Sequence, residues 1–95
     1  MQALSTLVFR LMSELERVHF YKLEHRLADL ILIRASSDGV LRMTQQEIAR
    51  HLGTTREVVA RIMQAFVRQN LVTTRRGATK IKNAAGLSCI NSHDA

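Results

Sequence analysis

Residues 45–66 read QQEIARHLGTTREVVARIMQAF, and this stretch predicts two short helices joined by a tight turn. Gly53 lies between the two helical patterns and can adopt the positive φ that such a turn requires. Ala49 supplies a small side chain where two steeply crossing helices approach each other. The pattern is typical of a helix-turn-helix, and a plain helical hairpin is the alternative. The apolar residues expected to face inward are Ile48, Ala49, Leu52, Val58, Val59, Ile62, Met63 and Phe66.

Capping residues stand at the start of each helix. Thr44 and Glu47 form the pattern of a capping box, in which the threonine hydroxyl accepts from the Glu47 amide while the carboxylate reaches back. At the second helix, Thr54 is a candidate N-cap, and Glu57 would then close a second capping box. We expect the second helix to end at Asn70.

The whole chain predicts a mainly α fold with a small β-hairpin wing: a winged helix-turn-helix that follows a long dimerisation helix. Neither proline nor glycine interrupts residues 2–35, so we expect one continuous helix there. The later elements are a turn at 36–39, a strand at 40–43, hairpin strands at 71–74 and 79–82, and a helical turn at 84–87. The domains expected are a dimerisation helix at 1–22, a winged domain at 23–88 and a loose tail at 89–95.

The N-terminal segment carries a narrow apolar seam with alternating steps of four and three residues, which is the spacing of a coiled coil. A wider stripe, typical of a globular core face, begins at Leu23. We therefore expect the helix to pair with a second copy and then to enter its own domain. The alternative is an amphipathic helix that packs only on that domain. The seam consists of Leu4, Val8, Leu11, Leu15 and Val18.

Positive charge is concentrated in the second half of the chain. The net charge is +6, and most of the basic residues are arginines, whose planar guanidinium pairs with a phosphate or a guanine edge. Residues 42–82 contain nine basic and two acidic side chains, whereas residues 2–41 contain five of each. This asymmetry indicates a surface that binds a polyanion.

The sequence argues against several other classes of protein. The single cysteine, Cys89, cannot form an internal disulfide or a metal cluster, and we expect no cofactor. Sequence motifs of nucleophilic, metal-dependent and nucleotide-binding enzymes are absent. There is no signal peptide, and the longest apolar run, residues 30–33, is far below membrane-spanning length. We expect a reducing cytoplasm and no membrane partner.

The exposed face of the second helix carries the candidate base-reading residues, Arg56, Glu57 and Arg61. They lie toward the N-terminal end, which enters the major groove in this motif. An arginine can bond both guanine acceptors, and a carboxylate can accept from cytosine N4. For Glu57, base reading competes with the capping role above. Arg61 stands one turn away, where it could orient Glu57.

Candidate phosphate contacts surround these readers. Two arginines stand at the expected wing tip, and the start of the first helix of the motif offers polar side chains and backbone amides. For the wing arginines, the alternative is a charged edge that keeps the protein in solution. The candidates are Thr44, Gln45, Thr55, Gln64, Arg75 and Arg76.

The sequence from Leu23 to about Leu87 resembles the catabolite-activator and fumarate–nitrate regulator (Crp/Fnr) family. The resemblance rests on LEHRLA at 23–28, TQQEIA at 44–49, LGTTREVVAR at 52–61, NLV at 70–72 and Gly77. In that family the arginine, glutamate and second arginine of the Thr-Arg-Glu-x-x-x-Arg segment read bases of a palindromic operator. The resemblance therefore implies this role for Arg56, Glu57 and Arg61.

The resemblance also implies partners. It implies binding to double-stranded DNA as a homodimer, with RNA polymerase as a further candidate partner. Family members carry an upstream sensing domain, so we expect this chain to be part of a longer regulator; a free-standing short repressor is the alternative. A protein-interaction or RNA-binding winged helix is the alternative function, although the expected DNA-facing surface lacks the exposed aromatic side chains that RNA-binding proteins usually stack on bases.

Overall fold

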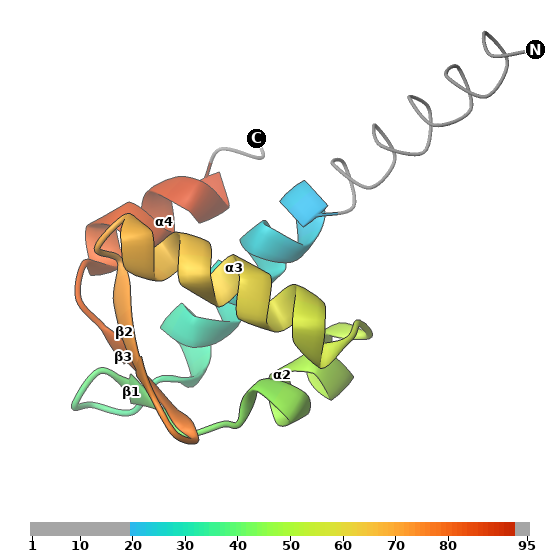
Figure 1. Cartoon of the computed structure of the whole chain (residues 1–95). Coiled ribbons are helices and arrows are strands. Elements are labelled where there is room, and N and C mark those ends of the chain that lie inside the picture. The colour runs from blue at the N-terminus through green and yellow to red at the C-terminus, as the bar shows by residue number, and fades with distance from the viewer. Residues whose placement is uncertain (1–19, 93–95) are drawn as a thin grey trace, which may run out of the picture.

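The computed structural model describes residues 20–92, with side chains described through Ile90. Residues 20–34 are helical and are called helix 20–34 below. The elements that follow are β1 (Val40–Leu41), α2 (Gln45–Leu52), α3 (Arg56–Arg68), β2 (Val72–Arg75), β3 (Ala78–Ile81) and α4 (Ala84–Ser92) (Figure 1). The predicted dimer seam, Leu4 to Val18, lies outside the described residues.

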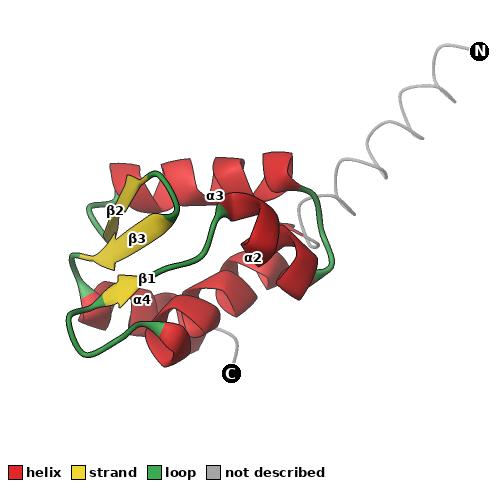
Figure 2. Ribbon diagram, turned by 90° about the horizontal axis from the view of Figure 1, so that it is seen from below, coloured by secondary structure: helices red, strands yellow, loops and turns green. Residues whose placement is uncertain are grey.

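The elements enclose one core. In Figure 2, α3 lies along one side of the molecule and helix 20–34 with α4 along the other, while the strands and α2 lie toward opposite ends. The predicted inward faces of α2 and α3 are confirmed, except that Val58 is only partly buried. Buried apolar side chains of helix 20–34 are Leu23, Leu27, Ala28, Leu30 and Ile31. Burial of these aliphatic groups is the main contribution to stability.

Local hydrogen bonds fix both ends of α2. The predicted capping box is present: the Glu47 amide donates to Thr44 Oγ1 over 3.1 Å, and the Thr44 amide donates to Glu47 Oε1 over 3.0 Å. Gly53 ends the helix with a φ of 72°, as the turn was predicted to require. Arg26 of helix 20–34 also donates from Nη1 to the Leu52 carbonyl over 3.1 Å. The carbonyl end of α2 is thereby joined to helix 20–34.

The three strands form an antiparallel sheet in the order β1-β3-β2. The pair Arg75↔Ala78 closes the β2–β3 hairpin, so the wing turns through Arg76 and Gly77 alone. Gly77 has a φ of 71°, a conformation that glycine adopts without strain. The hairpin was predicted in the right place, but β2 begins one residue later than expected, and β1 is limited to Val40–Leu41.

Helix α4 is longer than the sequence analysis predicted. A helical turn at 84–87 was expected and residues 89–95 were assigned to a loose tail, yet the helix continues through Ser92. Leu87 is fully buried and Ile90 packs against the core, so the helix has an apolar anchor beyond its first turn. The Asn83 side chain caps its start by accepting from the Gly86 amide over 3.0 Å.

One polar side chain lies inside the apolar core near the start of helix 20–34. The His25 residue is only 5% exposed, and within the described structure neither ring nitrogen has a hydrogen-bond partner. The ring makes an edge contact with Tyr21, with centroids 4.5 Å apart. Burial raises the pKa of the neighbouring Glu24 carboxyl, and the charge of His25 opposes that rise. Burial therefore disfavours the charged form of the Glu24 carboxyl.

None of the helices between residues 20 and 92 combines the length and the apolar character needed to span a membrane.

Candidate nucleic-acid interface

The N-terminal turn of α3 presents Arg56, Glu57 and, one turn later, Arg61 to solvent. The opposite face of α3 is anchored by buried Val59, Ile62, Met63 and Phe66. Because a helix exposes the residues that do not face its core, this anchoring fixes the direction in which the three polar side chains project. All three predicted base-reading side chains are therefore exposed on α3, away from its buried face.

The N-cap of α3 is Thr55, so the proposed capping role of Glu57 is wrong. The hydroxyl of Thr55 accepts from the Val58 amide over 3.3 Å, and Val58 occupies the position where a capping-box carboxylate would stand. The Glu57 side chain is exposed and forms no hydrogen bond or ion pair with any described residue. Its carboxylate is consequently available to an external donor.

The predicted contact between Arg61 and Glu57 is also absent from the described structure, where the ion pair formed is Arg42–Asp38 at 2.7 Å. The Ser36 hydroxyl donates to Asp38 as well. These bonds, that to Arg42 foremost, hold the pKa of the Asp38 carboxyl well below its usual range. The Arg42 charge is thus neutralised locally, whereas the arginines of α3 and the wing have no carboxylate partner within residues 20–92.

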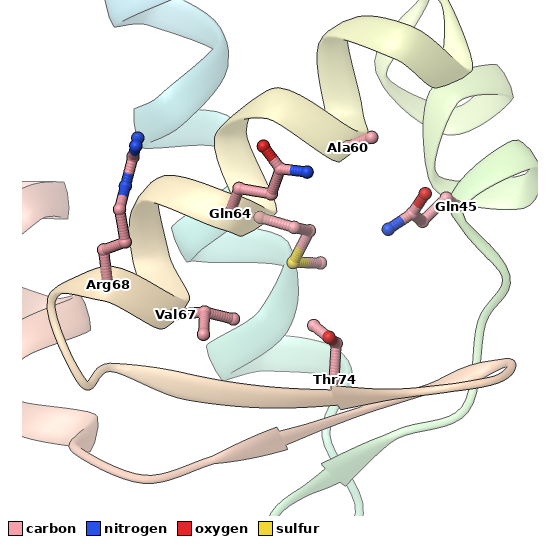
Figure 3. Close-up of a pocket in the computed structure, with 7 residues that line it drawn as sticks. Gln45, Ala60, Gln64, Val67, Arg68 and Thr74 are labelled. Atoms are coloured by element: carbon pink, nitrogen blue, oxygen red, sulfur yellow. The ribbon is translucent and has the colours of Figure 1, made fainter.

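Three adjoining hollows lie along α3. The first, the α3–wing groove, has a volume of about 500 Å³ and lies between α2, α3 and β2 (Figure 3). The second, the tip groove, has about 580 Å³ between the α2 N-terminus and the wing tip. The third, the α3 hollow, has about 510 Å³. Its lining residues are Gln46, Thr55, Arg56, Glu57 and Ala60.

Shared residues show that these hollows form one continuous concave surface. Gln45 and Thr74 line both the α3–wing groove and the tip groove, and Arg56 lines both the tip groove and the α3 hollow. Ala60 lines the α3 hollow and the α3–wing groove. Arginines in the combined lining are Arg56, Arg68, Arg75 and Arg76, whereas Glu57 is its carboxylate. The surface is concave and positively charged, as a polyanion site requires.

The predicted phosphate contacts are distributed over this surface. Thr44, Gln45, Arg75 and Arg76 meet at the tip groove, whereas Thr55 lines the α3 hollow and Gln64 the α3–wing groove. Both threonine hydroxyls accept from helix amides and keep their own proton for a further acceptor. The Thr44 amide, by contrast, is already bonded to Glu47.

Sequence reasoning did not assign Ala60 or Thr74 to the site, whereas Gln46 was expected to face a phosphate and lines the tip groove and the α3 hollow. Thr74 is brought to the site only by the fold of the wing. A signal existed for Ala60, because it stands four residues after Arg56 and so on the same helix face. Arg61 is exposed but lines none of the three hollows.

A helix pair joined by a tight turn, an exposed polar second helix and a β-hairpin wing define a winged helix-turn-helix DNA-binding domain. The family described as the Crp-like helix-turn-helix domain matches residues 25–90. The chain therefore belongs to this family, and its class is a DNA-binding domain of a transcription regulator.

Solved structures agree with this assignment. The catabolite activator protein of Thermus thermophilus superposes with a TM-score of 0.79 and 26% identity over 97% of this chain and 44% of that one. A putative Crp/Fnr-family regulator from Eubacterium rectale gives a TM-score of 0.71, with 28% identity, 94% of this chain and 42% of that one. The reduced CO-sensing protein of R. rubrum, at 21% identity, shares the fold with a TM-score of 0.80 over 92% of this chain and 44% of that one.

The chain therefore spans less than half the length of these similar proteins. No curated protein sequence matches it.

Proposed function

We propose that this domain reads an inverted-repeat operator as a homodimer, with Arg56, Glu57 and Arg61 as its base-reading residues. The observation that carries the proposal is the exposed start of α3, where Arg56 and Glu57 have no protein partner among the described residues and border a concave, arginine-lined surface. A free guanidinium suits the two acceptors of guanine, and a free carboxylate suits the amino group of cytosine. Their proximity predicts guanine and cytosine within one half-site.

Phosphate contacts supply the greater part of the proposed affinity. The tip groove gathers Arg75, Arg76 and the Thr44 hydroxyl, all of which can bind a phosphate oxygen. The Thr55 hydroxyl and Gln64 extend this grip along α3. Such contacts fix the position of α3 on the duplex without distinguishing sequences.

Pairing through the seam at Leu4 to Val18 would place two α3 helices about one DNA turn apart, roughly 34 Å. A homodimer with this spacing recognises a palindrome, because each copy reads one half of it. Contact with RNA polymerase and the presence of an upstream sensing domain stay predictions of the sequence.

Enrichment from a randomised duplex pool at moderate salt tests the proposal. We expect an inverted repeat that contains guanine, with half-site centres about one turn apart. A Leu11→Glu variant, which breaks the apolar seam, should sediment as a monomer and enrich a single half-site. Salt-sensitive binding to every duplex without enrichment would contradict the base-reading assignment. Preferential enrichment from a randomised RNA pool would indicate that the partner is RNA and not DNA.

A further inference from the structure

The middle of the exposed α3 face is marked by a small apolar side chain. Arg56, Ala60 and Gln64 follow one another at intervals of four residues and therefore lie in one row along the helix. Ala60 is half-buried and borders both the α3 hollow and the α3–wing groove. Figure 3 places Ala60 on α3 across an open space from Gln45 of α2.

The chemistry of this position differs from that of its neighbours. Arg56, Glu57 and Gln64 can all bond to polar base edges, whereas the Ala60 methyl group can neither donate nor accept a hydrogen bond. A polar base edge held against it would lose its water without gaining a partner. An apolar group loses nothing there and is removed from water, which is favourable.

One apolar group is displayed by bases in the major groove: the C5-methyl group of a pyrimidine, present on thymine and on 5-methylcytosine. The α3 hollow has about 510 Å³ beside Ala60, so a methyl group has space to enter. A helix rises about 6 Å over four residues, which corresponds to one or two base-pair steps of roughly 3.4 Å. The base opposite Ala60 is therefore near the guanine opposite Arg56.

We propose that Ala60 is a specificity-determining residue that receives the C5-methyl group of a pyrimidine one or two base pairs from the guanine read by Arg56. This inference rests on the proposed function, because it requires α3 to lie in the major groove. It predicts that the methyl group itself increases the affinity of the domain for the operator, whether thymine or 5-methylcytosine carries that group.

A methyl scan of the enriched operator tests the inference. Each thymine within two base pairs of the expected guanine is replaced by uracil, and each cytosine by 5-methylcytosine, on either strand. These exchanges remove or add one methyl group and leave the hydrogen-bonding edges of the base unchanged. At one position, the methylated base should bind about fourfold tighter per half-site, which corresponds to the burial of one methyl group.

Variants at Ala60 identify the receiving side chain. Ala60→Gly should reduce the thymine-to-uracil affinity ratio to about one. Ala60→Val places two more methyl groups where the C5-methyl group of the base would lie, so it should make uracil the preferred base. The uracil duplex is the reference in each affinity ratio, so a general loss of affinity in a variant does not change the result. Circular dichroism and thermal denaturation verify that Ala60→Gly is folded, since glycine weakens a helix interior.

The outcomes separate the inference from the proposed function. An operator that is enriched but insensitive to every methyl exchange would overturn the inference and leave the proposed function standing. A methyl effect that persists unchanged in Ala60→Gly would assign the contact to another side chain and would also overturn it. If no inverted repeat is enriched at all, the proposed function fails and the inference fails with it.

Discussion

At the scale of a single residue, substitution of Arg56 tests the base-reading assignment. Arg56 borders both the tip groove and the α3 hollow. Arg56→Ala should weaken operator binding by about 1–3 kcal/mol and relax the choice of base at one guanine. The comparison is Arg68→Ala, at the C-terminal end of α3, which should weaken all duplexes to a similar degree. Titrations against the operator and its single-base variants measure both effects. Equal weakening of every sequence by Arg56→Ala would instead make Arg56 a phosphate contact.

His25 gives a second prediction, which concerns stability. Its buried ring nitrogens have no hydrogen-bond partner in the described structure, and such groups cost about 1–3 kcal/mol. His25→Phe keeps a ring against Tyr21 and removes the buried polar atoms, so the free energy of unfolding should rise by about 1 kcal/mol. Urea denaturation at pH 7.5 measures the change, with Tyr21→Phe as the control for the ring contact. A clear loss of stability in His25→Phe would mean that the ring nitrogens are bonded in solution.

The sequence predicted that Arg56, Glu57 and Arg61 are exposed on α3, but it could not decide between the two possible roles of Glu57. Thr54 and Thr55 are adjacent and equally suited to cap a helix, and a shift of one residue decides whether Glu57 is bonded or free. The burial of His25 was equally hidden, since no local pattern distinguishes a buried histidine from an exposed one. Only the packing of the whole chain settled both points.

At the scale of the element, α2 carries a pH-dependent cap. Hydrogen bonds from the Thr44 backbone, chiefly, and from its side chain lower the pKa of the Glu47 carboxyl below its ordinary value of 4.5. A lowered pKa in the folded state adds stability above pH 4.5, and this stability is lost as the pH falls through the folded-state value. Glu47→Gln keeps a carbonyl acceptor for Thr44 but does not titrate.

We therefore expect the unaltered domain to be more stable than Glu47→Gln at pH 7, by a margin that shrinks below pH 4.5. Urea denaturation of both proteins at pH 7, 5 and 3.5 measures this margin. Taking the difference between the two proteins removes the contributions of other groups, including Asp38. A margin that stays constant across these values would show that Glu47 has the same pKa in the folded and unfolded states.

Elements were predicted well where their patterns are local and less well where they depend on tertiary contacts. The α2 cap, the glycine turn and the inward faces of α2 and α3 follow from nearby residues alone. The extent of α4 depends on Leu87 and Ile90 packing against a core formed by distant segments. The three-residue spacing of these two side chains was a visible helical signal, but it is too short to stand alone.

At the scale of the whole molecule, the arginine-lined concave surface predicts strong salt dependence. Each phosphate contact releases counterions, so the logarithm of affinity falls with the logarithm of salt concentration by about 0.9 per contact. Replacing Arg75 and Arg76 together by alanine should therefore reduce this slope by about two for each half-site. Titrations of the enriched operator between roughly 50 and 200 mM salt measure it.

The Arg42→Ala variant is the matched control, because Arg42 is held by Asp38 and lies outside the three hollows. Its slope should equal that of the unaltered protein. An unchanged slope in the double wing variant would instead indicate that the wing arginines serve only to charge an exposed edge.

The bond from Arg26 to the Leu52 carbonyl has a mechanical consequence. Helix 20–34 and α2 both contribute side chains to the core, and the Arg26 bond also connects them at the carbonyl end of α2. The angle between the two helices is therefore held by two kinds of contact. A rotation of helix 20–34 about its axis would therefore move α2 as a rigid body. Because α3 packs against α2, α3 would move with it. In a homodimer, a small rotation close to the two-fold axis would produce a larger displacement of α3, which lies farther from that axis. We therefore expect that loss of the Arg26 side chain would weaken the coupling between helix 20–34 and α2.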